Sequence, residues 1–118
     1  MIVGACLVEL HIHGCQSLKA KRGVVRSIVR RVRNRFNLSV AEVGGQDTWQ
    51  LAVLGLSAAG SDALRVRQVL ERASAFIEDL HLAEVRSVDF EMLHLPQEEP
   101  FLEGDDDGRA DDGDEDPS

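Results

Sequence analysis

Apolar and polar residues alternate along positions 2–14 of the chain, IVGACLVELHIHG. The even positions towards the end of this segment are apolar: Cys6, Val8, Leu10 and Ile12. The odd positions beside them are polar: Glu9, His11 and His13. Because successive side chains of a strand point to opposite faces of a sheet, this pattern predicts a β-strand with one buried face.

Two other segments have apolar residues at helical spacing. The first covers positions 18–36 and places these residues on one apolar stripe: Leu18, Val25, Ile28, Val29, Val32 and Phe36. The second runs to about position 80 and repeats the pattern: Val66, Val69, Leu70, Ala73, Phe76, Ile77 and Leu80. Ser17 and Asp62 precede the two segments, and both residue types are favoured N-caps. The spacing therefore predicts two amphipathic helices.

Three further segments are rich in β-formers, at positions 38–45 (LSVAEVGG), 48–59 (TWQLAVLGLSAA) and 83–95 (AEVRSVDFEMLHL). The stretch GGQD, positions 44–47, is the expected turn between the first two. The resulting order, β-α-β-β-α-β, predicts an α+β ferredoxin-like sandwich. In this fold a four-stranded antiparallel sheet carries two helices on one face.

The net charge of −8 comes from the last part of the sequence. Positions 1–100 contain twelve basic and twelve acidic residues, whereas positions 101–118 contain one Arg and nine Asp or Glu. The final stretch is also rich in glycine, so it lacks the apolar surface that would offset the entropy of ordering it. We expect a ferredoxin-like domain at 1–97 and an acidic disordered tail at 98–118.

The segment 17–36, SLKAKRGVVRSIVRRVRNRF, contains eight basic residues and no carboxylate. Five of them fall within an arc of about 80° beside the apolar stripe and span roughly 20 Å: Lys19, Arg22, Arg26, Arg30 and Arg33. Cations near a helix N-terminus and like charges four residues apart both reduce helix stability. A helix that retains them is typical of an anion-binding surface. The candidate phosphate contacts are Lys19, Lys21, Arg22, Arg26, Arg30 and Arg33.

Other partners could satisfy this basic segment. Carboxylates elsewhere in the domain are available: Asp62, Glu71, Glu78 and Asp79. The acidic tail is a third possibility, because a tethered segment competes with external ligands at a high effective concentration. In that case the tail would act as a nucleic-acid mimic that weakens non-specific binding.

His11, His13 and Cys15 form an H-x-H-x-C spacing of potential metal ligands, with Glu9 on the same predicted strand face. A single short cluster of this kind is more typical of half-exposed strand residues. The sequence therefore assigns no metal site, no cofactor and no catalytic residue, and an enzyme using Glu9, His11 and His13 around a metal is the least favoured interpretation. Trp49 is expected in the core or at an interface, and the open sheet face is a candidate surface for homo-oligomers.

The passage QSLKAKRGVVRSIVRRVRNRFNLSVAEVGGQDTWQ, positions 16–50, resembles the YlxP-like family of small bacterial proteins, a domain of unknown function. The most specific parts are Ser17 to Arg22, Phe36 to Glu42, and Gln46 to Gln50. The resemblance covers about positions 1–95 and implies a ferredoxin-like bacterial protein. Family members are often encoded beside translation initiation factor 2 and ribosome-binding factor A, which implies a role near ribosome assembly or translation.

These observations lead to a non-enzymatic RNA- or ribosome-associated module that uses the basic helix at 18–36. The alternative is an oligomeric protein-interaction domain that docks this helix onto an acidic protein partner. No apolar run approaches the roughly 20 residues needed to cross a bilayer, and the first residues lack the basic region of a signal peptide. With only two cysteines, no disulfide framework is indicated. We therefore expect a cytoplasmic protein without a membrane partner.

Overall fold

The computed structural model describes residues 1–96. Its elements follow the predicted order, and their bounds are β1 (Ile2–His11), α1 (Leu18–Arg35), β2 (Ser39–Gly44), β3 (Leu51–Gly60), α2 (Ala63–Asp79) and β4 (Glu84–His94). The expected acidic tail at 98–118 lies outside the described residues, as does position 97.

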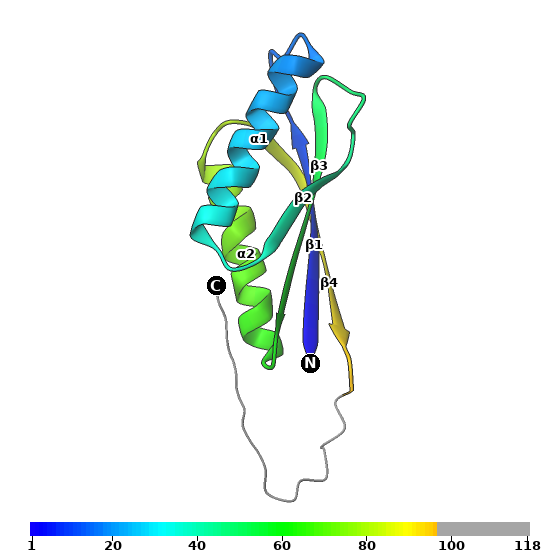
Figure 1. Ribbon diagram of the computed structural model, residues 1–118, viewed down its shortest axis with the longest axis vertical. Helices are drawn as coiled ribbons and strands as arrows, with labels where there is room; N and C mark the ends of the chain where they lie inside the picture. Colours follow the sequence, from blue (N-terminus) through cyan, green and yellow to red (C-terminus); the bar gives the residue numbers. More distant parts are fainter. Residues whose placement is uncertain (97–118) are drawn as a thin grey trace, which may run out of the picture.

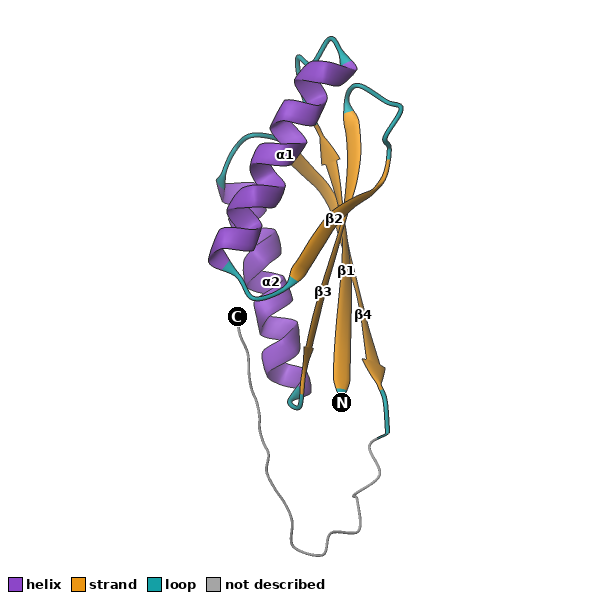
Figure 2. Ribbon diagram, viewed as in Figure 1, coloured by secondary structure: helices purple, strands orange, loops and turns teal. Residues whose placement is uncertain are grey.

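The four strands form one antiparallel sheet in the order β2-β3-β1-β4. Strand β1 is central and pairs along its full length with β3 on one side and β4 on the other. Both helices cover the same face of this sheet, and the other face is left open (Figure 1; Figure 2). The arrangement confirms the predicted ferredoxin-like α+β fold.

The core lies between the helices and the inner face of the sheet. Its fully buried members come from every layer: Val8, Leu10, Leu54, Ile28, Val32, Leu70 and Ile77. Burying a side chain of this size stabilises the fold by about 1.5–3 kcal/mol. Gly4 permits helix α2 to approach β1 closely, because a Cβ at this position would lie 2.7 Å from Leu70 Cδ1 and from Val66 Cγ1.

A β-bulge interrupts the pairing of β1 with β4. Glu9 lies opposite Ser87, but the next residue, Leu10, lies opposite Val85, so Arg86 is the extra residue. Beyond the bulge, His11 lies opposite Glu84. Because a shift of one residue exchanges the two faces of a strand, the bulge places Glu84 on the open face of the sheet. A regular ladder would have turned it towards the helices.

Candidate nucleic-acid interface

Helix α1 begins where the sequence predicts, and its first turn contains no acidic residue. The hydroxyl oxygen of Ser17 accepts a hydrogen bond from the backbone N–H of Ala20 at 3.0 Å, which confirms Ser17 as the N-cap. Val25, Ile28 and Val32 point into the core and fix the rotation of the helix. The opposite side of α1 is therefore turned towards solvent.

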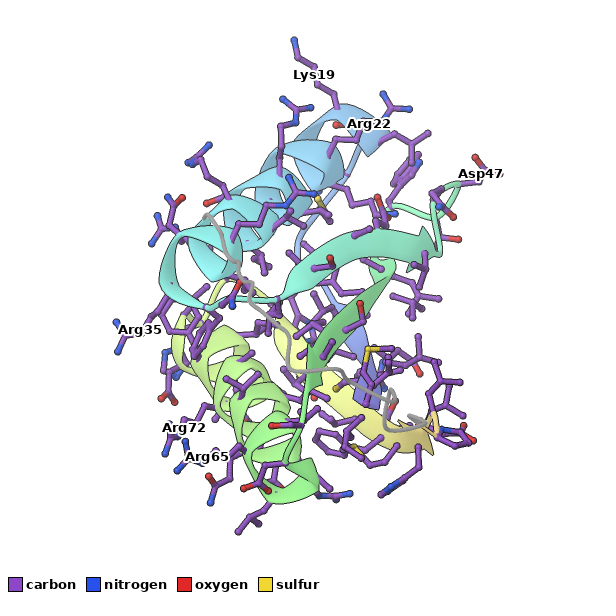
Figure 3. All side chains as sticks on the ribbon, turned by 60° about the horizontal axis from the view of Figure 1, so that its bottom comes forward. Lys19, Arg22, Arg35, Asp47, Arg65 and Arg72 are labelled. Atoms are coloured by element: carbon purple, nitrogen blue, oxygen red, sulfur yellow. The ribbon has the colours of Figure 1, made fainter. Side chains whose placement is uncertain are left out.

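Four of the candidate cations form one exposed surface, which we call the basic face of α1: Lys19, Arg22, Arg26 and Arg30. Figure 3 shows Lys19 and Arg22 pointing away from the first turns of the helix, clear of the sheet. Within residues 1–96, no carboxylate forms an ion pair with any member of the basic face. Four positive charges thus stand along one side of one helix.

Three more arginines of α1 contact their own chain. Arg33 Nη2 donates a hydrogen bond to the carbonyl oxygen of Val40 at 3.0 Å, which joins α1 to β2. Arg31 Nε donates to Ser27 Oγ at 3.2 Å. The guanidinium of Arg35 lies 5.2 Å from the centre of the Phe76 ring, a cation–π contact with α2. Arg33 is nonetheless exposed, and its remaining N–H groups stay available at the end of the basic face.

Lys21 does not belong to this surface, and the expectation that it contacts phosphate is corrected here. Its side chain is only 1% exposed. Lys21 Nζ lies 2.9 Å from Glu42 Oε2 on β2, and it donates a hydrogen bond to the carbonyl oxygen of Gly45. The sequence contained a signal for this, because Lys21 precedes Val25 by four residues and Ile28 by seven and so shares their buried side.

The acidic residues considered as partners of α1 are engaged elsewhere or lie apart from it. Asp62 caps α2, its Oδ1 accepting from the N–H groups of Leu64 at 2.9 Å and Arg65 at 3.4 Å. Glu71 Oε2 lies 3.1 Å from Arg67 Nε on the same helix. Neither these carboxylates nor Glu78 and Asp79 form an ion pair with α1 in the described part of the chain. Internal neutralisation by them does not account for the basic face.

His11, at the end of β1, and His13, in the turn after it, meet a carboxylate that sequence reasoning missed. His13 Nε2 lies 2.7 Å from Glu84 Oε1 and 3.1 Å from His11 Nδ1. Cys15, the third residue of the H-x-H-x-C spacing, is buried away from them, and Glu9 accepts a hydrogen bond from the hydroxyl of Ser87 at 3.2 Å. The hydrogen bond from His13 is the main cause that lowers the pKa of Glu84, with the charge of Arg86 acting in the same direction. Glu84 is therefore a carboxylate at neutral pH.

Cys6 lies on the inner face of β1 and is 1% exposed. The pKa of its thiol is raised to about 11, mainly by burial and also by the charge of Asp89, with Arg67 acting in the opposite direction. A thiol with this pKa is protonated at neutral pH, and only the thiolate is a strong nucleophile.

The open face of the sheet and the β2–β3 turn expose apolar side chains. Leu7, Val43 and Leu93 stand on three different strands and are 48%, 52% and 58% exposed. Trp49, which we expected in the core or at an interface, lies in the turn and is 50% exposed, so it is not a core residue of this chain. Within the described residues, no helix is long and apolar enough to cross a membrane.

The structure thus defines a small ferredoxin-like α+β protein with one strongly basic helix. Residues 3–90 match the family described as "Protein of unknown function (DUF503)", and the chain belongs to this family. It is 40% identical over 77 residues to "Uncharacterized protein YlxP" of Bacillus subtilis (strain 168), a match that covers 65% of this chain and 84% of that protein. These findings confirm the resemblance drawn from the sequence.

A solved structure is also similar in outline. The crystal structure of SnoaB, a cofactor-independent oxygenase from Streptomyces nogalater, aligns with a TM-score of 0.44 and 10% sequence identity, over 84% of this chain and 98% of that one. A likeness at this level does not bear on the function of this chain.

Proposed function

We propose that the protein is a non-enzymatic, RNA- or ribosome-associated module that binds phosphates through the basic face of α1. The observation that carries the proposal is the set of four exposed cations on one side of the helix, without an ion-paired carboxylate in residues 1–96. The mutual repulsion of these cations, and the unfavourable position of Lys19 and Arg22 near the N-terminus of α1, would both be relieved by an anionic ligand. The gene neighbourhood implied by the family resemblance supports a ribosomal rather than a general polyanion.

The arrangement suits a nucleic-acid backbone better than a single anion. The rise of 1.5 Å per residue separates the Cα atoms of Lys19 and Arg30 by about 16 Å, so the side chains can reach several successive phosphates. Arg33 extends the row by roughly another turn with the N–H groups that it does not donate to Val40. Phosphate contacts of this kind position a protein on RNA without reading its sequence.

The decisive experiment measures the binding of a fluorescent structured RNA to the full chain across a salt series. Four phosphate contacts predict that the logarithm of the affinity falls with the logarithm of the salt concentration, with a slope of about −3. The double variant Arg26→Glu, Arg30→Glu should bind at least about tenfold more weakly and with a shallower slope. The matched control is Arg65→Glu, Arg72→Glu, which makes the same charge change on exposed arginines of α2 (Figure 3).

The two double variants separate the outcomes. Selective loss of binding in the α1 variant supports the proposal. An affinity that does not change with salt, or equal losses in both variants, overturns it. If the α1 variant loses a protein partner in a pull-down while RNA binding is unchanged, the alternative holds and the helix docks onto an acidic protein.

The open sheet face favours a second candidate, an oligomeric interaction domain. Leu7, Val43 and Leu93 provide apolar surface on three strands, and a two-fold contact between copies covers the same patch on both. Light scattering on the full chain tests this directly. A dimer that Leu7→Asp converts to a monomer supports it, and a monomer at every concentration rules it out.

A further inference from the structure

A compact group of metal-ligating side chains lies at one end of the sheet, where β1 ends and β4 begins, and not on α1. The described part of the chain brings together His11, His13 and Glu84, whose ligand atoms all lie within 4.8 Å of one another. The separate distances are 3.1 Å between His11 Nδ1 and His13 Nε2, 2.7 Å between His13 Nε2 and Glu84 Oε1, and 3.8 Å between His11 Nδ1 and Glu84 Oε1.

These spacings are close to those that a bound zinc ion requires. With metal–ligand bonds of about 2.0–2.1 Å, adjacent ligand atoms of a tetrahedral site are about 3.3–3.4 Å apart. The three observed distances lie on both sides of this value. An ion could therefore enter with small rotations of the side chains and without movement of the backbone.

The backbone places the three residues at one end of the sheet. His11 is the last residue of β1, and His13 lies in the turn that follows, two residues further on. The chain remains paired beyond His11, because the N–H of Ile12 donates to the carbonyl oxygen of Gln50 at 2.9 Å. Glu84 is the register partner of His11 only because of the bulge at Arg86. Bulges of this kind often re-aim a side chain at a functional site.

The ligand set and its exposure indicate the class of metal. Two imidazoles and one carboxylate suit zinc and its neighbours among the divalent transition metals better than Mg²⁺ or Ca²⁺, which prefer oxygen ligands. The side chains are 24%, 66% and 51% exposed for His11, His13 and Glu84, so an ion can reach them from solvent. A hollow of about 540 Å³ beside His13 and Glu84 is also lined by Glu78 and His81.

We propose that His11, His13 and Glu84 bind one zinc-class divalent ion where β1 ends and β4 begins, with its remaining coordination positions facing this hollow. Three protein ligands leave at least one position for water or for a donor group of another molecule. The site is independent of the basic face of α1, so it does not rest on the proposed nucleic-acid binding.

The test titrates the chelator-treated, untagged full chain with Zn²⁺ by calorimetry in excess Mg²⁺. The Mg²⁺ occupies the acidic stretch at 101–118, whose carboxylates would otherwise bind zinc weakly. We expect one equivalent of zinc to bind. Substituting a residue that only supports a metal ligand lowers metal affinity by about 10–100-fold. Because His13→Ala removes a ligand itself, its zinc affinity should fall by about 100-fold or more. Glu84→Gln keeps the size of the side chain and should weaken binding as well.

His94→Ala is the matched control, because it removes one imidazole at the far end of β4, where His94 pairs with Ile2. Its zinc affinity should equal that of the unchanged protein. Titration with Co²⁺ gives a second readout, because the visible absorption of bound Co²⁺ depends on its nitrogen and oxygen ligands. This absorption should differ between His13→Ala and the unchanged protein. Absence of a one-equivalent phase, or equal binding by His13→Ala and His94→Ala, would overturn the site and leave a hydrogen-bonded cluster only.

Discussion

Lys21, which is buried, and Glu42, which is 21% exposed, join helix α1 to strand β2 through an ion pair, with 2.9 Å between Lys21 Nζ and Glu42 Oε2. Glu42 Oε2 receives no hydrogen bond of good geometry within the described residues, so the attraction between the two groups is mainly coulombic. The ammonium also donates to the carbonyl oxygen of Gly45 in the β2–β3 turn. One buried cation therefore sets the distance between the basic helix, an edge strand and a turn.

Replacing Lys21 by Met should destabilise the protein by about 3 kcal/mol, because it leaves the buried Oε2 atom of the partly exposed Glu42 carboxylate without a compensating charge. Urea unfolding followed by circular dichroism measures the change. Lys19→Met is the control, since it makes the same substitution at an exposed position of the same helix and should stay within about 0.5 kcal/mol. Adding Glu42→Leu to Lys21→Met should restore much of the loss. Equal stability of the two Met variants would contradict this role of Lys21.

Gly23→Ala should stabilise the protein by about 0.5–1 kcal/mol. Gly23 lies inside α1, and a Cβ at this position would meet no atom within 4 Å. Thermal unfolding should show a raised midpoint without a change in RNA affinity. Gly45→Ala provides the opposite case, because Gly45 has φ of 75° and its Cβ would lie 2.8 Å from the carbonyl oxygen of Leu51. A stabilised Gly45→Ala variant would show that this turn is not constrained as described.

The thiol of Cys6 should make stability depend on pH in the alkaline range. Its pKa is raised from 9.0 to about 11 in the folded protein, so the unfolded chain loses this proton first as the pH rises. The stabilisation is complete below pH 9 and is lost as the pH rises towards 11, by about 2–3 kcal/mol in total. Cys6→Ala removes this titration. Its free energy of unfolding should fall less than that of the unchanged protein between these pH values, and parallel curves would contradict the prediction.

Deleting positions 103–118 should strengthen RNA binding at low salt. This segment contains nine acidic residues and one Arg, which can compete with RNA for the basic face of α1 at a high effective concentration. The salt series described above, repeated with the shortened chain, measures the effect, and the gain should disappear as salt screens both interactions. An unchanged affinity at low salt would limit these residues to a solubilising role.

Most of the fold could be predicted because each element carries its own pattern. The apolar spacing of α1 and α2, the caps Ser17 and Asp62, and the alternation along β1 all depend on neighbours within a few residues. The same reasoning placed Lys19, Arg22, Arg26 and Arg30 on the exposed side of α1, and the structure agrees. The ends of the strands were predicted less accurately. Strand β1 ends at His11, earlier than the alternation over positions 2–14 suggests, and β3 starts at Leu51, later than the predicted start at position 48.

The sequence by itself determined the order of elements, the face that each element buries and the row of cations on α1, because these follow from local periodicity. Only the tertiary structure decided that Lys21 is buried and that His11 and His13 contact Glu84. Lys21 is buried because Glu42, on another element, compensates its charge. Glu84 faces the histidines because a bulge shifts one strand by a single residue. Both relationships depend on contacts between distant segments, which local periodicity does not specify.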